Sequence, residues 1–219
     1  MEVQNLKTAV QQMYQICDQM EEKTNFRENM GLHEDATVTN ILKMNLICFM
    51  AYLAASDGVV SWKECRFIGE IMDVRMTPAK LNEIIQDNNI YSTEFEENPP
   101  MILRIFVAMD NTLYENGIDN STELGDALFE LYRFVTVGLI EANGRSSETM
   151  EEGEREDAQT YLGMMRNYID DNTEKHHTDI ILDYGKNHKR KKKDDDSGVK
   201  APEKNQKAAG SVKAPKKKM

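Results

Sequence analysis

The sequence predicts an all-α fold, in which a single helical domain is followed by a Lys-rich tail. Through most of residues 2–185, apolar residues recur at spacings of three and four, and no segment keeps the alternation of a half-buried strand. Aromatic residues make up only 7% of the chain and the five prolines lie mostly near segment ends, a balance that favours helices over sheets. The 219 residues are enough for one domain of ordinary size plus a tail.

The first half of the chain contains four predicted helices. Residues 2–22 have one apolar face, so they form an amphipathic helix, whereas residues 38–55 are apolar almost all round and predict a central, buried helix. A third helix runs over about 61–74. A short fourth helix follows Thr77, a candidate N-cap, with Pro78 at its first position.

The second half predicts four more helices, which makes roughly eight in all by this periodicity. One spans about 99–116 after a pair of prolines, and the next spans 121–142 with Ser121 as its candidate N-cap. The last two cover about 147–170 and 173–185.

Charge separates an acidic body from a basic tail. Residues 186–219 hold 13 of the 27 Lys and Arg and 4 of the 38 Asp and Glu, so the tail carries +9 and the preceding residues −20. The tail has no apolar periodicity and no aromatic residue, so we expect it to be disordered. The predicted organisation is therefore an N-terminal amphipathic helix in 1–29, a helical domain in 30–185 and the tail in 186–219.

Two features predict a cytoplasmic protein. The N-terminus lacks a basic start followed by an apolar core, so no signal peptide is expected, and the longest apolar stretch, 46–55, is about half of a membrane span. The three cysteines are an odd number, and each lies in an apolar-periodic segment, as reduced core thiols do.

The chain contains a weak internal repeat. The stretch LAASDGVVS at 53–61 ends one apolar helix and opens the next, and LIEANGRSS at 139–147 does the same. The matched pairs are Leu53 with Leu139, Asp57 with Asn143, Gly58 with Gly144, and Ser61 with Ser147. We therefore expect a pseudo-twofold helical domain with both short loops at one end.

The first of these loops ends like an EF-hand calcium loop. If Asp57 is placed at loop position 5, Glu64 falls at position 12, the place of the bidentate Glu. Positions 1 and 3 would then be Leu53 and Ala55, which have no side-chain oxygen, so the loop is not an EF-hand. Ser61 and Glu64 have the spacing of a capping box, which explains them as the start of a helix.

The D-G-x-x-S-x-x-E pattern after a buried helix, loosely repeated in the second half, resembles the tellurite-resistance TerB-like family over about residues 30–170. The resemblance implies an all-helical pseudo-symmetric domain that takes part in stress response and binds a divalent cation through acidic residues at the helix junctions. Asp57 and Glu64 match the family pattern, whereas Asn143 stands where the second half should have an acid.

In the second half, the residue that corresponds to Glu64 is Met150, and several acids follow it. The resemblance makes Glu154 and Asp157 the candidate ligands there. The expected metal set is therefore Asp57, Glu64, Asn143, Glu154 and Asp157, with calcium the first choice of cation and no other cofactor.

The expected function is a binding or sensing module rather than an enzyme. The sequence has no nucleophile elbow, no phosphate-binding glycine loop and no catalytic carboxylate pair with a base, and it identifies no small-molecule substrate. A Met-rich composition suits a groove for a protein partner. The alternative is an adaptor tethered through its tail by weak, sequence-independent contact with nucleic acid or an anionic membrane, since the tail has no aromatic residue for base stacking.

Overall fold

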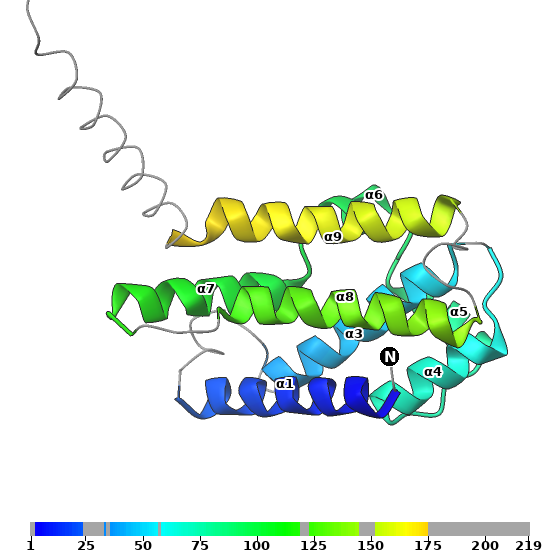
Figure 1. The fold of residues 1–219 in the computed structure, drawn as a ribbon, viewed down its shortest axis with the longest axis horizontal. Coiled ribbons are helices and arrows are strands. Elements are labelled where there is room, and N and C mark those ends of the chain that lie inside the picture. Colours follow the sequence, from blue (N-terminus) through cyan, green and yellow to red (C-terminus); the bar gives the residue numbers. More distant parts are fainter. Residues whose placement is uncertain are drawn as a thin grey trace, which may run out of the picture. The chain divides into compact units, whose positions relative to one another are not determined.

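The computed structural model describes residues 3–23, 33, 36–56, 58–118, 123–144 and 152–174, with only the backbone described at 23 and 152–154. All regular secondary structure in these residues is helical, which confirms the predicted fold class (Figure 1). The predicted tail lies outside the described residues. The helices are α1 (Val3–Lys23), α3 (Val38–Ala54), α4 (Trp62–Met72), α5 (Pro78–Asp87), α6 (Thr93–Glu97), α7 (Met101–Glu115), α8 (Leu124–Ala142) and α9 (Glu152–Asn172).

Helix α3 lies at the centre of the fold, as its uniformly apolar sequence predicts. It contacts α1, α4, α5, α7, α8 and α9, and Figure 1 shows it running obliquely behind the long helices α1 and α8. Ten of its seventeen residues are buried. A helix that is apolar on every side needs neighbours on every side, and the surrounding helices provide them.

Five aromatic rings join α3 to the helices on the α9 side. Tyr161 of α9 lies within 6.3 Å, centroid to centroid, of the four other rings: Phe49, Tyr52, Phe95 and Tyr132. Such close ring pairs add stabilisation beyond the area that they bury. This cluster therefore fixes α6, α8 and α9 around one end of the core.

Most predicted helix starts are confirmed, but α8 and α9 begin later than predicted, α9 at Glu152 rather than at about 147. Most of the predicted helix 173–185 lies outside the described residues. Thr77 caps α5, whose first residue is Pro78. Helix α8 begins at Leu124, three residues later than predicted, and the side chain of its N-cap residue does not cap the helix. Asp110 of α7 instead accepts the backbone N–H groups of Leu124 and Gly125, both at 2.8 Å. Ser121, the predicted cap, lies outside the described residues.

Helix α6 was not predicted, because five residues are too few to show a helical period. Its start is nevertheless local: the Ser92 side chain accepts the N–H of Phe95 at 3.2 Å. The predicted core thiols are confirmed, since Cys17, Cys48 and Cys65 are all free and buried.

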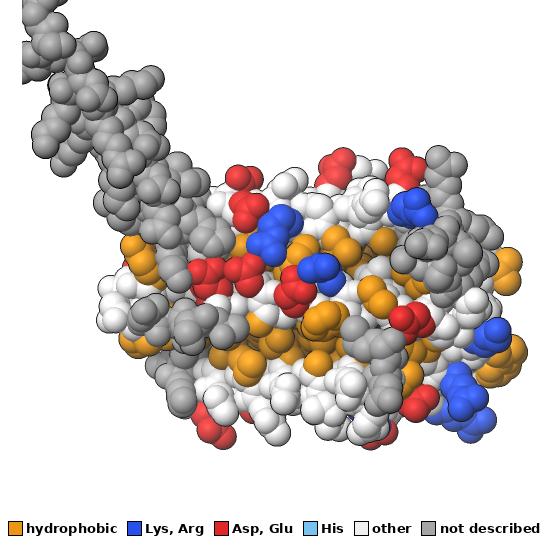
Figure 2. Space-filling view, in the orientation of Figure 1, with side chains coloured by type: hydrophobic (Ala, Val, Ile, Leu, Met, Phe, Trp, Pro, Cys, Tyr) orange, Lys and Arg blue, Asp and Glu red, His pale blue; other side chains and the backbone are white. Residues whose placement is uncertain are grey.

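Helix α8 packs closely on α1 and α4 but leaves part of its length exposed. A Cβ atom at Gly138 would lie 2.8 Å from the Phe67 ring and 3.1 Å from Leu6, so only glycine permits this approach. Elsewhere on α8, Phe134 and Val137 are exposed, and Figure 2 shows apolar side chains along the face that α8 forms in this view.

None of the described helices is long and apolar enough to cross a lipid bilayer.

Candidate functional site at the paired helix junctions

The first junction is a complete capping box. The Ser61 hydroxyl accepts the N–H of Glu64 at 3.2 Å, and the Glu64 Oε2 accepts the N–H of Ser61 at 2.7 Å. Gly58 precedes this cap with a φ of 80°, a left-handed conformation that most residues avoid. The capping explanation of the motif is therefore confirmed.

The second junction contacts the first through Asn143, the C-cap residue of α8. Its Nδ2 donates to the Glu64 Oε1 at 2.5 Å, and its Oδ1 accepts from the Ser61 hydroxyl at 3.2 Å. Gly144 follows with a φ of 76°, close to that of Gly58, its partner in the repeat. The two loops thus lie at one end of the fold, as the repeat predicts.

Glu64 is the unusual member of this group, because its carboxylate is buried. The residue is only 2% exposed, yet its hydrogen-bond partners are the neutral groups of Ser61 and Asn143. Within the described part of the chain, no Lys or Arg forms an ion pair with it. Buried charges are normally paired with an opposite charge or bound to a metal, which makes this carboxylate a candidate ligand for a cation.

A basic side chain lies close to the second loop. The Lys63 Nζ would be 3.8 Å from a Cβ atom placed at Gly144. Lys63 itself is exposed.

The other predicted ligands are placed less completely. Asp57 and the side chain of Glu154 lie outside what the structure describes. Asp157 lies beside Tyr52 and Glu96: burial and then the Glu96 carboxylate raise its pKa, while a hydrogen bond from Tyr52 lowers it. The single hydroxyl hydrogen of Tyr52 has a second acceptor in the Glu96 Oε1, which lies 3.4 Å from the hydroxyl oxygen.

Of the five predicted ligands, the structure therefore brings Glu64 and Asn143 into contact and places Asp157 in a group with Tyr52 and Glu96. In the described ranges, no three His, Cys, Asp or Glu side chains gather in a way that could hold a metal ion. The sequence pattern did not indicate the Glu96 and Asp157 pair, because Glu96 belongs to the short helix that periodicity could not detect.

Comparison of the chain with protein-family models, with curated proteins and with solved structures finds no match. The resemblance to TerB-like proteins consequently remains a prediction that rests on the motif and its repeat. The contact of Asn143 with Ser61 and Glu64 is present in the structure whether or not the chain is TerB-like.

Proposed function

We propose that this chain is a TerB-like helical binding module that senses a divalent cation, calcium in the first instance, where its two helix junctions meet. The observation that carries the proposal is the contact between the buried Glu64 carboxylate and Asn143, which joins the two halves of the repeat at one acidic group. The setting in stress response comes from the sequence resemblance alone.

In the cation-free state, the Asn143 amide would occupy the position of the ion. Calcium takes carboxylate and amide carbonyl oxygens as ligands at 2.3–2.6 Å. Turning the Asn143 amide by half a rotation exchanges its oxygen and nitrogen, so that its carbonyl joins Glu64 in facing the ion. The Ser61 hydroxyl, now donating to Asn143, would then accept from the turned amide.

Asp57 supplies the second carboxylate in this proposal, since it lies in the loop that leads into the Ser61 cap. An ion held by Asp57, Glu64 and Asn143 would connect the start of α4 to the end of α8. Binding would thereby change the strength of the connection between the two halves of the domain. The coupling of a local charge change to the packing of helices is the basis of sensing by such modules.

Calorimetric titration of the full chain with calcium tests the proposal. We expect one binding event in the wild type and its loss in Glu64→Gln, because Gln keeps a capping acceptor but has no charge. Glu70→Gln is the matched control, since Glu70 is an exposed residue of the same helix and the substitution removes the same charge.

The single Trp of the chain provides a second readout. Trp62 directly follows the Ser61 cap and is 69% exposed, so its fluorescence should change when the junction binds an ion. Equal calcium responses in the wild type and Glu64→Gln, or none in either, would contradict the proposal and leave the capping box as the whole role of Glu64.

A further inference from the structure

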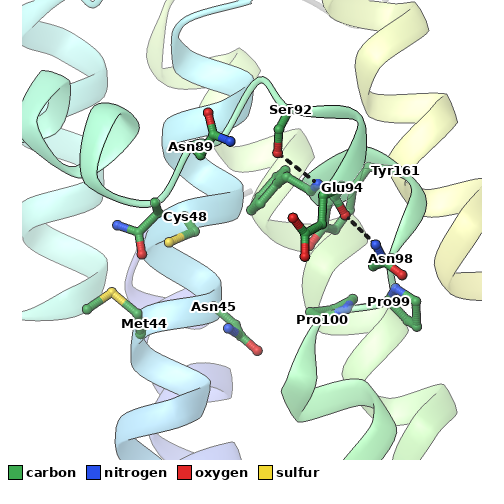
Figure 3. Close-up of a pocket in the computed structure, with 12 residues that line it drawn as sticks. Met44, Asn45, Cys48, Asn89, Ser92, Glu94, Asn98, Pro99, Pro100 and Tyr161 are labelled. Carbon is green, nitrogen blue, oxygen red and sulfur yellow. Dashed lines mark hydrogen bonds between the residues drawn. The ribbon is translucent and has the colours of Figure 1, made fainter.

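A cavity of about 390 Å³ opens between α3 and α6. In Figure 3, Met44 and Cys48 of α3 lie on one side of it and Glu94 of α6 lies on the other. Its volume is in the range of sites that bind small molecules. Neither Glu64 nor Asn143 lines the cavity, so an inference about it goes beyond the function proposed for the paired junctions.

The charge of the cavity is negative. Among the described residues that line it, Glu94 is the only Asp, Glu, Lys, Arg or His. Within the described ranges, the exposed Glu94 carboxylate makes no ion pair and accepts no hydrogen bond. Burial raises the pKa of the Cys48 thiol to about 11, so this thiol is neutral at pH 7 and adds no charge.

Two asparagine amides of the cavity are oriented by their own helices. The Asn88 Nδ2 donates to the Ile84 carbonyl at 2.9 Å, and the Asn98 Nδ2 donates to the Glu94 carbonyl at 2.8 Å, a bond drawn in Figure 3. Because the oxygen and nitrogen of an amide diverge, each Oδ1 is turned away from the carbonyl that its nitrogen contacts. Neither Oδ1 has a hydrogen-bond partner among the described residues, so both remain acceptors for a ligand.

The end of a helix adds to the negative potential. Asn88 is the C-cap residue of α5, and no basic residue lies in the last turn of that helix. The final carbonyls of a helix carry the negative end of its dipole, about half an elementary charge, which favours a cation nearby.

The rest of the wall is carbon surface. Phe95, Pro99, Pro100 and Tyr161 line the cavity, and Met44 contributes its chain at the 49% exposed mouth position. Burial of an aliphatic chain against such a surface is favourable, and aromatic faces also attract an organic cation.

We propose that the cavity binds a small organic monocation, a primary ammonium group attached to an aliphatic chain. An ammonium group has three N–H donors and no acceptor, which complements the Glu94 carboxylate and the Asn88 and Asn98 oxygens. A calcium ion suits the cavity less, because it takes about six to eight oxygen ligands and would leave the carbon wall without a partner.

Titration of the full chain with n-pentylammonium chloride, followed by ¹H–¹⁵N NMR, tests the proposal. 1-Pentanol is the neutral probe with the same chain, and pentanoate is the anionic one. In phosphate buffer of low ionic strength, n-pentylammonium should shift the resonances of residues 88–98 and should bind about fivefold more tightly than 1-pentanol, the scale of an exposed charge pair. Pentanoate should not bind, and raising the ionic strength to about 0.15 M should reduce the preference for the cation.

Two variants and a control separate the site from the acidic surface as a whole. Glu94→Gln should weaken n-pentylammonium binding about fivefold and leave 1-pentanol binding unchanged. Glu83→Gln removes the same charge from an exposed position of α5 that does not line the cavity, so it should bind as the wild type does. Asn89→Asp adds a carboxylate to the lining at a φ of 49°, which Asp tolerates, and should strengthen n-pentylammonium binding.

Three results would overturn the proposal. One is the absence of n-pentylammonium binding, and another is equal binding of n-pentylammonium and 1-pentanol. The third is that Glu94→Gln and Glu83→Gln bind n-pentylammonium alike while circular dichroism shows both variants to be folded as the wild type is. None of these results bears on calcium binding at the paired junctions, which Glu64→Gln tests separately.

Discussion

Replacing Glu64 by Ala should lower the free energy of unfolding by about 2–4 kcal/mol. The substitution removes the acceptor for the Ser61 N–H, and loss of a helix cap costs about 1 kcal/mol. It also leaves the Asn143 Nδ2 without its acceptor at a site where Glu64 is 2% exposed, and an unsatisfied buried donor costs about 1–3 kcal/mol. Glu64→Gln should cost less than about 1 kcal/mol, because a turned Asn143 amide can accept from Gln.

Urea denaturation followed by far-ultraviolet circular dichroism measures both effects in calcium-free buffer. Combining Glu64→Ala with Asn143→Ala completes a double-mutant cycle, in which we expect a coupling energy of about 1–2 kcal/mol. Glu70→Ala is the control, and its exposed position predicts a change within about 0.5 kcal/mol. A coupling energy near zero would refute the reasoning, because the contact between the two junctions would then contribute nothing to stability.

Three further predictions concern the scaffold. Asp110→Ala should destabilise by about 1–3 kcal/mol, since two N–H groups of α8 lose their acceptor; an unchanged urea midpoint would contradict this. Gly138→Ala should cost about 1–3 kcal/mol, because its Cβ would lie 2.8 Å from the Phe67 ring. Gly163→Ala in α9 has open space around its Cβ and should stabilise by up to about 1 kcal/mol. Equal unfolding temperatures of these two variants would refute the close packing at Gly138. The pKa of Asp157 is raised above its ordinary 3.8, so its contribution to stability is present at low pH and is lost as the pH rises through the raised value. In Asp157→Asn the free energy of unfolding should no longer fall over that pH range. A variant whose free energy of unfolding depends on pH as that of the wild type does would contradict this prediction.

The features that the sequence predicted well are those encoded locally. The apolar run of α3 predicts a central helix because every side of it must be covered, and the capping box at Ser61 is written in four consecutive residues. The repeat also placed both short loops at one end. The repeat could not predict the hydrogen bond between Glu64 and Asn143, because these residues lie 79 positions apart in sequence.

The features that were missed depend on tertiary structure or on very short segments. The cap of α8 comes from Asp110 on the preceding helix, so no local pattern around Ser121 could reveal it. Helix α6 has five residues, fewer than the two turns that periodicity needs, and Glu96 was therefore not seen as a neighbour of Asp157.

The most direct test of the central claim is the calcium response of Asn143→Asp, a substitution that restores an acid at the second junction. Without calcium, the new carboxylate should face that of Glu64 where the amide now donates at 2.5 Å, so the variant should unfold at a lower temperature than the wild type. Added calcium should reverse this loss and should raise the unfolding temperature by more than it does in the wild type, with about 2.7 kcal/mol gained at a hundredfold excess over Kd. An excess of the chelator EGTA should abolish the gain. An unfolding temperature of Asn143→Asp that is lowered but does not respond to calcium would contradict a cation site at the paired junctions.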